Sequence, residues 1–317
     1  MTARRSGKRA AVTVVIPTRD RLDLVRRSVR SALAQQDVGV TVVLVDDGSR
    51  PETAEALDGL AGARVRVVHH AESRGVSRAR NAGLALAETP WVAFMDDDDY
   101  WAPDKLSSQL RAVSGVPGAG WSCVGAVHVD DDVRPLHWHR PPTAEEAVAV
   151  LSRSGGIPGG GSGVLVATAL AREVGAFDPE FAVLADWDFY YRLALAADVA
   201  PVDRPLVGYY RHGDSMFHDP GALGEELVAL DDKYRGGAAP LELSYADWAV
   251  QLLLMAWRRR DAGVLRQVLG LEVVRRAGTS EVAQSVLRRL GRGVRADRRE
   301  CPPSWQEEQL GWLDCAA

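Results

Sequence analysis

Short apolar runs alternate with segments of helical periodicity over roughly the first third of the chain. Four runs are predicted to be buried strands: Val12–Ile16, Val40–Val45, Val65–Val68 and Trp91–Met95. Between the first two, apolar residues recur at helical spacing from Leu22 to Leu33, and we expect Asp20 to cap this helix. Strands separated by helices of about a dozen residues are typical of parallel βαβ units. The pattern therefore predicts an α/β fold.

The pattern changes in the middle of the chain. Val124–Val129 and Leu136–His139 flank an acidic turn and predict a hairpin, and a helix is expected over Asp186–Ala197. The glycine-rich stretch 155–163 lacks the lysine of a phosphate-binding P-loop, so we interpret it as a flexible loop. Beyond Asp219 the chain is predicted to be almost wholly helical.

Composition suits one large or two modest globular domains, with 317 residues, 46% of them hydrophobic, and a net charge of -5. No apolar stretch approaches the roughly 20 residues that span a bilayer. No long apolar run follows the basic residues at the start, so we expect 1–11 to be a disordered tail and not a signal peptide. Three widely spaced cysteines favour a cytoplasmic location. The acidic pI argues against nucleic-acid binding.

Positive charge is concentrated near the C-terminus. Residues 251–300 contain twelve arginines and five acidic residues, a local net charge of +7 in an otherwise acidic chain. Such a run is most often a solvated helix face. The alternatives are a docking surface for an acidic substrate, for a membrane surface or for a second subunit.

Carboxylates gather where predicted strands end. Asp96–Asp99 directly follow the fourth strand, Asp46 and Asp47 follow the second, and Asp186 with Asp188 begins a later helix. The carboxyl ends of parallel strands meet at one edge of a sheet, where ligands bind. Packed carboxylates repel one another unless a cation neutralises them, and oxygen ligands suit Mg²⁺ or Mn²⁺, which can hold a diphosphate. The alternatives are a solvated acidic turn at 96–99 and an ordinary Asp-Gly-Ser turn at 47–49.

Seven short motifs occur in the order found in one known family. They are 14–18 (Val-Val-Ile-Pro-Thr), 45–49 (Val-Asp-Asp-Gly-Ser), 79–83 (Ala-Arg-Asn-Ala-Gly), 94–99 with 103–105, 175–179, 185–188 with 191–193, and 210–213. Together they resemble glycosyltransferase family 2. The resemblance covers about residues 12–218 and implies a GT-A fold, a Rossmann-like and mostly parallel sheet flanked by helices. The remaining region, 219–317, carries no such resemblance and is expected to be helical.

The resemblance implies an inverting transfer of a sugar from a nucleotide-diphosphate sugar, with a UDP-sugar preferred, to a glycan, natural product, lipid or peptide acceptor. A divalent cation, Mn²⁺ or Mg²⁺, and an arginine are expected to stabilise the leaving diphosphate. One alternative is a sugar-phosphate nucleotidyltransferase, but Pro17-Thr18-Arg19-Asp20 stands where that enzyme needs a glycine-rich loop. The other is a non-catalytic carbohydrate-binding or assembly protein derived from a transferase, which would not hydrolyse a donor.

By resemblance, the donor and the metal bind at the strand ends. Asp96 and Asp98 match the family's Asp-x-Asp motif, with Asp98 expected to bind the metal and Asp96 the ribose or the metal. Because four acids stand in a row, Asp97 or Asp99 could share the role. The other donor-side residues implied are Pro17, Thr18, Asp46 and Asp47 for base and ribose, Arg80 for the diphosphate, and His212 for the diphosphate or the metal. A surface helix for Arg80 and a structural loop for His212 are the alternatives.

The acceptor side is implied by the motif at 185–188. Asp186 resembles the family's catalytic base, which takes the acceptor's proton. The family commonly has Glu-Asp where this chain has Ala185-Asp186, so Asp188 stays a second candidate, and a helix N-cap is the structural alternative. Trp187 is expected to be either a stacking platform for an acceptor or a core residue.

Overall fold

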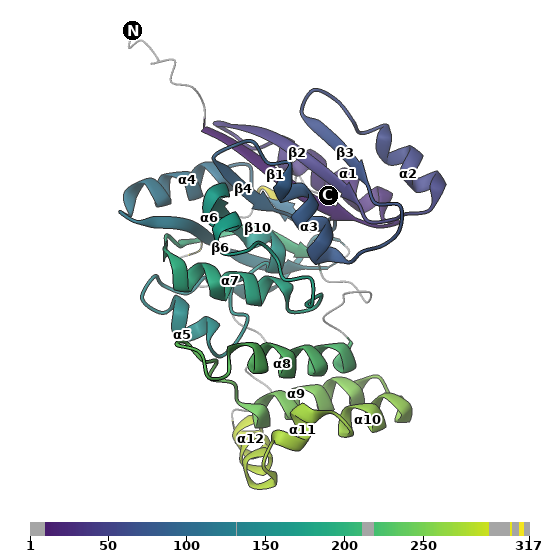
Figure 1. The fold of residues 1–317 in the computed structure, drawn as a ribbon, viewed down its shortest axis with the longest axis vertical. Helices are drawn as coiled ribbons and strands as arrows, with labels where there is room; N and C mark the ends of the chain where they lie inside the picture. Colours follow the sequence, from purple (N-terminus) through teal and green to yellow (C-terminus); the bar gives the residue numbers. More distant parts are fainter. Residues whose placement is uncertain (1–9, 131, 211–218, 292–304, 306–310, 314–317) are drawn as a thin grey trace.

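The computed structural model describes residues 10–130, 132–210, 219–291, 305 and 311–313. A ten-stranded sheet forms the centre, and helices pack around it (Figure 1). The strands are β1 (Ala10–Thr18), β2 (Val38–Asp46), β3 (Val65–His69), β4 (Trp91–Phe94), β5 (Tyr100–Trp101), β6 (Ala119–Val129), β7 (Pro135–His139), β8 (Val164–Ala167), β9 (Asp198–Val199) and β10 (Val202–Tyr210). The helices are α1 (Leu22–Leu33), α2 (Pro51–Asp58), α3 (Val76–Ala85), α4 (Lys105–Gly115), α5 (Ala147–Leu151), the 3-10 helix η1 (Gly160–Gly163), α6 (Thr168–Glu173), α7 (Ala185–Ala196), α8 (Pro220–Tyr234), α9 (Tyr245–Arg258), α10 (Ala262–Leu269), α11 (Glu272–Arg276) and α12 (Thr279–Gly291).

The strand order is β3-β2-β1-β4-β8-β6-β10-β5, with β7 and β9 paired to β6. The first four strands pair in parallel, as predicted from the helices between them. β8 lies antiparallel between β4 and β6, and β6–β7 is the predicted hairpin. The α/β class is confirmed. The second half of the sheet is more mixed than expected, because β8 runs antiparallel to both of its neighbours, β4 and β6.

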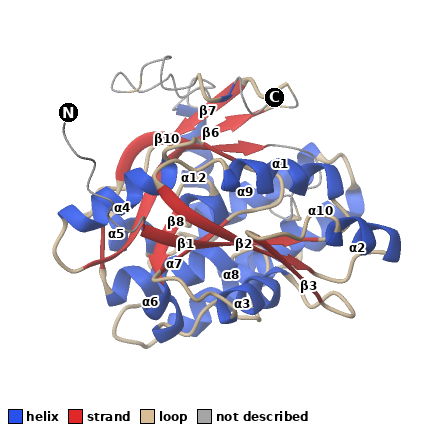
Figure 2. Cartoon of the chain, turned by 90° about the horizontal axis from the view of Figure 1, so that it is seen from above, coloured by secondary structure: helices blue, strands red, loops and turns tan. Residues whose placement is uncertain are grey.

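Both faces of β1 are buried, which explains its unbroken apolar sequence. Val14 and Ile16 pack in the cluster on the α1 side, whereas Val15 belongs to the cluster on the opposite side. There, a Cβ added at Gly83 would lie 2.9 Å from Val15 Cγ2, so α3 reaches the sheet only because residue 83 is glycine. Helices therefore flank the sheet on both sides (Figure 2), and α3 holds Arg80 close to the strand ends.

The C-terminal helices share the hydrophobic core of the preceding part of the chain. Leu223, Leu227 and Leu230 of α8 are fully buried in one cluster with the core side chains of α7. Trp248 of α9 packs on Trp187 of α7, with ring centroids 5.9 Å apart. Figure 1 shows α8 to α12 below α7, with α9 beside α8. The predicted boundary at residue 218 separates two sequence patterns but not two cores.

Some local predictions are corrected. Ala10 and Ala11, expected in the tail, begin β1, and residues 1–9 lie outside the described residues. Asp20 does not cap α1, since its backbone φ is +55° and its carboxylate instead accepts the Arg50 N–H at the start of α2 (2.9 Å). None of the helices in the described ranges is both long enough and apolar enough to cross a membrane.

Two tryptophans near the C-terminus, Trp305 and Trp312, lie against the sheet and not in the helical layer. Trp305 is 3% exposed, packs on Trp138 of β7 with ring centroids 5.9 Å apart, and donates its Nε1–H to Asp203 O (3.0 Å). Trp312 packs with Leu313 against the sheet residues of β6. The region was predicted to be almost wholly helical, and these two positions lie outside its helices, where their apolar side chains cover the sheet.

Candidate active site

Asp96–Asp99 run from the end of β4 into a partly enclosed cluster. Asp97 accepts hydrogen bonds from Thr18 Oγ1 (2.7 Å) and Arg21 Nη1 (3.2 Å). Arg21 Nη1 also donates to Asp98 Oδ2 (2.8 Å). The alternative of a solvated acidic turn does not hold, because Asp97 is 6% exposed and its partners come from the end of β1 and the start of α1.

The carboxylates repel one another despite these partners. Burial, followed by the charge of Asp98, raises the pKa of Asp97 to about 6, although Thr18 and Arg21 stabilise the carboxylate. Burial, with the charges of Asp98 and Asp96, also raises the pKa of the fully buried Asp99 well above its usual value. A cation bound among these carboxylates would stabilise their ionised forms and so oppose this rise in pKa.

Arg80 of α3 lies at the same edge of the sheet. Its side chain is 6% exposed, and Nη2 donates to Asp96 Oδ1 (2.6 Å). Its guanidinium lies 5.1 Å from the centroid of the Phe177 ring. Burial opposes the charge, but Asp96 and then Asp186 hold the pKa of Arg80 above its usual value. Arg80 is thus a buried cation among carboxylates and not a surface arginine, and a guanidinium is a strong ligand for phosphate.

The glycines of η1 allow its backbone to pass close to these side chains. A Cβ added at Gly161 would lie 2.7 Å from Asp96 Oδ1. A Cβ added at Gly160 would lie 3.4 Å from Asp186 Oδ2 and 3.9 Å from Asp96 Oδ2. Asp186 of α7 and Asp96, two residues after β4, therefore lie near each other beside η1, together with Arg80, although they are far apart in the sequence.

Asp186 is partly exposed in the first turn of α7. Burial raises its pKa above the usual value, against the attraction of Arg80, and the charge of Asp96 acts in the same direction as burial. The N-cap of α7 is Leu184, so Asp186 does not have the capping role that we considered. A carboxylate whose pKa is raised toward neutral pH is suited to accept a proton.

Asp188 and Trp187 do not face an acceptor. Asp188 is fully buried and binds Arg192 Nη2 (2.6 Å), Lys233 Nζ (2.6 Å) and Tyr234 OH (2.8 Å), which ties α7 to α8. Trp187 is 2% exposed. Trp187 therefore has the core position that was one of its two predicted alternatives, and the burial of Asp188 contradicts its acceptor-side role, because α7 is covered on most of its surface.

Asp46 and Asp47 are buried at the end of β2 and organise the segment before α3. Asp47 accepts hydrogen bonds from His70 Nδ1 (2.8 Å), Ser73 Oγ (2.8 Å) and the Gly75 N–H (2.9 Å). Burial alone would raise the pKa of Asp47, but these hydrogen bonds lower it below the usual value. Asp47 thus links the end of β2 to the segment before α3, which an ordinary Asp-Gly-Ser turn would not do. The contact of Asp46 and Asp47 with a nucleotide stays a prediction.

The donor chemistry of the acidic cluster suits a divalent cation. Asp96 and Asp98 offer the oxygen ligands that Mg²⁺ and Mn²⁺ prefer. Among the described residues, however, no three His, Cys, Asp or Glu side chains are arranged to hold a metal ion. His212 lies outside those residues. Arg21 and Arg80 neutralise part of the cluster instead, so a cation that binds Asp98 through Oδ2 would compete with Arg21.

Several residues that shape this site were missed by the sequence analysis. Arg21 bridges two of the acids. Asn81 donates to Phe177 O (2.7 Å) and accepts the Phe177 N–H (2.9 Å), and Tyr190 OH donates to Gly160 O (2.9 Å). The available signals were weak: Asn81 stands beside Arg80 within a motif, and Arg21 directly follows the segment after the first strand.

Comparison with known proteins agrees with this geometry. Residues 13–165 match the family described as Glycosyl transferase family 2. The chain contains a glycosyltransferase family 2 domain. The "Pre-mycofactocin glycosyltransferase" of Mycobacterium tuberculosis is 30% identical over 271 residues, which are 78% of this chain and 52% of the relative. "Succinoglycan biosynthesis protein ExoO" of Rhizobium meliloti is 40% identical over 100 residues, 32% of this chain and 29% of that protein. The chain thus spans about half or less of the lengths of these relatives.

Solved structures establish the fold of the family 2 domain and its C-terminal helices. S. aureus TarS 1-349 in complex with UDP-GlcNAc has a TM-score of 0.59 at 18% identity, covering 90% of this chain and 88% of that one. Mannosyltransferase PcManGT from Pyrobaculum calidifontis, in complex with GDP-Man and Mn2+, has a TM-score of 0.56 at 20% identity, covering 98% and 84%. The predicted GT-A fold is confirmed.

Proposed function

We propose that this chain is a metal-dependent, inverting glycosyltransferase that moves a sugar from a nucleotide-diphosphate sugar to an acceptor nucleophile. The observation that carries the proposal is the meeting of Asp186, Asp96 and Arg80 beside η1, within a family 2 domain. The UDP-GlcNAc and GDP-Man complexes of the similar proteins support a nucleotide sugar as the donor, and we favour a UDP-sugar. The cytoplasmic location stays a prediction.

In the proposed reaction, an acceptor O–H or S–H group attacks the anomeric carbon from the side opposite the diphosphate. Asp186 takes the proton as the new bond to carbon forms and the bond from carbon to the diphosphate oxygen breaks. The diphosphate leaves with the bonding electron pair, and Arg80 stabilises its charge. A divalent cation held by Asp96 and Asp98 would neutralise further charge on the diphosphate.

The donor is proposed to lie across the carboxyl ends of β1, β2 and β4, the edge at which open α/β sheets bind ligands. The side chains assigned to the donor are Pro17, Thr18, Asp46, Asp47, Arg80, Asp96 and Asp97, and the proposed metal ligands are Asp98, Asp96 and His212. The engagement of Asp188 with Arg192 and Lys233 supports Asp186 as the base.

The substitution Asp186→Asn tests the proposed base. Asparagine is nearly isosteric but cannot accept the proton, so we expect the rates of sugar transfer and donor hydrolysis to fall by roughly 10²–10⁴-fold with little change in donor affinity. The base must be ionised, and burial raises the pKa of Asp186. When the pH is lowered, the wild-type rate should therefore begin to fall at a higher pH than it would with an ordinary aspartate. Asp186→Asn should not show this loss of rate at low pH.

The measurement is release of UDP from a panel of UDP-sugars in the presence of Mn²⁺. Asp188→Asn is the matched control, and its rate per folded molecule should stay near that of the wild type. A rate for Asp186→Asn equal to the wild-type rate would contradict the assignment. Absence of any donor hydrolysis or transfer by the wild type, with nucleotide still bound, would favour the carbohydrate-binding alternative.

A further inference from the structure

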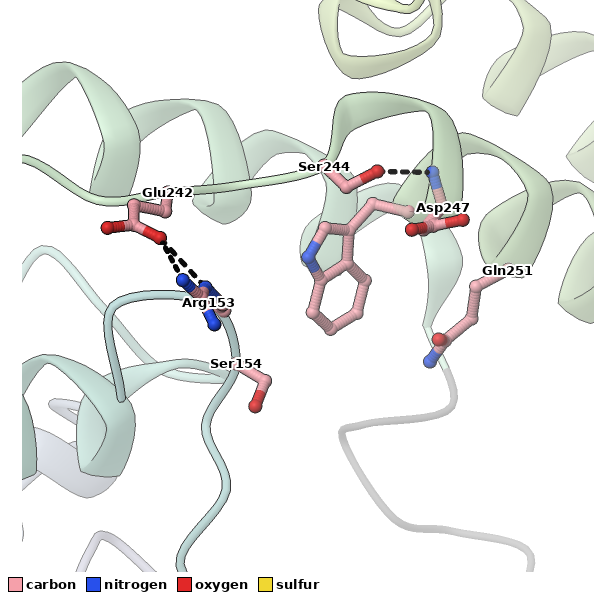
Figure 3. A pocket seen from close by; sticks show the side chains of 7 residues that line it. Arg153, Ser154, Glu242, Ser244, Asp247 and Gln251 are labelled. Carbon is pink, nitrogen blue, oxygen red and sulfur yellow. Dashed lines mark hydrogen bonds and ion pairs between the residues drawn. The ribbon is translucent and has the colours of Figure 1, made fainter. Parts of the chain in front are cut away.

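A polar groove lies between the segment that follows α5 and the start of α9 (Figure 3). Its volume is about 290 Å³, and it is lined by Arg153, Ser154, Glu242, Ser244, Asp247, Trp248 and Gln251. The first two residues belong to the family 2 domain, and the other five belong to the C-terminal region. The groove therefore exists only where these two parts of the chain meet.

The walls of the groove are fixed by contacts across this junction. Arg153 donates from Nε and Nη2 to Glu242 Oε2 (2.8 and 2.6 Å), as Figure 3 shows, and the Glu242 N–H donates to Ser152 O (2.8 Å). On the α9 side, Trp248 packs on Trp187, whose Nε1–H donates to Leu151 O (2.6 Å). A groove held in this way is preorganised, so a ligand would not have to order its walls.

The lining is chemically suited to a carbohydrate. One indole, from Trp248, supplies a flat apolar surface for the C–H face of a sugar ring. Two hydroxyls and an amide around it can exchange hydrogen bonds with sugar hydroxyls, whereas the carboxylates of Glu242 and Asp247 already pair with Arg153 and Arg288. A phosphate would meet the carboxylates of Glu242 and Asp247, and the cation of the lining, Arg153, is paired with Glu242. A largely apolar ligand would find a single aromatic side chain. The chemistry therefore points to a neutral sugar.

The groove is close to the candidate active site along the chain. Ser154 lines the groove, and Gly160, six residues later, lies beside Asp186 and Asp96. Six residues span at most about 20 Å. Trp187, on which the groove's Trp248 packs, also directly follows Asp186. A single extended molecule could therefore occupy both places.

We propose that this groove binds a sugar unit of the acceptor, away from the group that is glycosylated, so that the acceptor is a glycan of several units. This inference rests on the proposed function, since it takes Asp186 as the place where the acceptor reacts. It selects the glycan from among the acceptor classes that the sequence left open.

The test begins with an array of immobilised neutral oligosaccharides and their component monosaccharides, probed with the full chain. The oligosaccharide that binds best is then titrated by calorimetry. We expect the wild type to bind an oligosaccharide more tightly than its monosaccharides. Gln251→Ala and Trp248→Phe should each weaken that binding by roughly tenfold, about 1.4 kcal/mol, while UDP affinity stays unchanged.

Matched controls come from the same helical region. Trp257→Phe changes a tryptophan of α9 that is 69% exposed, and Gln284→Ala changes an exposed glutamine of α12; both should bind the oligosaccharide like the wild type. Trp248→Phe keeps an aromatic ring against Trp187, so its fold should survive. If the wild type binds no oligosaccharide, or if binding survives both groove substitutions, the inference is overturned. Failure of the proposed function would appear separately, as absence of UDP binding and donor hydrolysis.

Discussion

Arg21 binds two of the acids beside the proposed metal site. Its Nη1 lies 2.8 Å from Asp98 Oδ2 and 3.2 Å from Asp97 Oδ1, with the arginine side chain 32% exposed. A hydrogen bond to a charged group contributes about 1.5–3 kcal/mol, and less when solvent reaches the pair. A metal ion that binds Asp98 through the same oxygen must break this contact, and at either oxygen it is repelled by the guanidinium, so Arg21 should compete with the metal.

Replacing this competitor should strengthen metal binding. For Arg21→Met we expect Mn²⁺ affinity to rise by about fivefold, or about 1 kcal/mol, because the ion no longer displaces a guanidinium. The affinity is measured by calorimetry at about pH 8, where Asp97, with a pKa of about 6, is ionised. Arg26→Met, on the same helix and paired with the exposed Asp23, is the control and should leave the affinity unchanged. Weaker binding of Mn²⁺ to Arg21→Met would show that the arginine supports the metal site.

At the scale of secondary-structure elements, the features that could be predicted are those that depend on residues adjacent in the sequence. The strands were predictable because both faces of the sheet are covered, which leaves continuous apolar runs such as that of β1. The acids at 96–99 were predictable because they end such a run. The antiparallel placement of β8 was not, since it depends on pairing between segments distant in sequence.

The errors at the site have the same origin. Trp187 and Asp188 directly follow Asp186 and share its motif, yet α8 and α9 cover them. That cover comes from a region without recognisable motifs, so the sequence could not separate the partly exposed aspartate from the buried one. The bridge from Arg21 to Asp97 likewise joins residues on two elements.

The element that closes the site is η1, and its glycines should be essential. A Cβ at Gly161 would lie 2.7 Å from Asp96 Oδ1 and would also crowd Arg80. Gly161→Ala should therefore displace one or both side chains and weaken UDP-sugar binding by about tenfold or more, with a smaller effect on the melting temperature. Gly115→Ala is the control, because nothing lies within 4 Å of its added Cβ. Donor affinity at the wild-type level in Gly161→Ala would mean that η1 can move aside.

For the molecule as a whole, at least three of the twelve arginines of 251–300 pair with acidic residues of the same chain. Arg276 of α11 pairs with Asp232 of α8 (2.9 Å), Arg288 pairs with Asp247 (3.3 Å), and Arg275 pairs with Glu272 (3.3 Å). These contacts support the prediction of a solvated helix face and weaken that of a docking surface. A contact of this region with a membrane or a second subunit stays a prediction, and its test should avoid Arg276, whose reversal would break the pairing of α11 with α8.

The shared core predicts that the chain unfolds as one unit. Asp188 is fully buried and binds Lys233 of α8 as well as Arg192 of its own helix. Asp188→Asn removes the charge that both cations face, and breaking a buried pair costs about 3–5 kcal/mol. Because the two cations are 30% and 18% exposed, we expect a loss toward the lower end, about 3 kcal/mol. Denaturation in urea, followed by circular dichroism and tryptophan fluorescence, should show one coincident transition at a lower midpoint.

Asp178→Asn removes only the more exposed partner of Lys233 and should cost less than about 1 kcal/mol. Two separate transitions, or wild-type stability for Asp188→Asn, would mean that the helical layer folds independently of the family 2 domain despite the leucines of α8 in the common core.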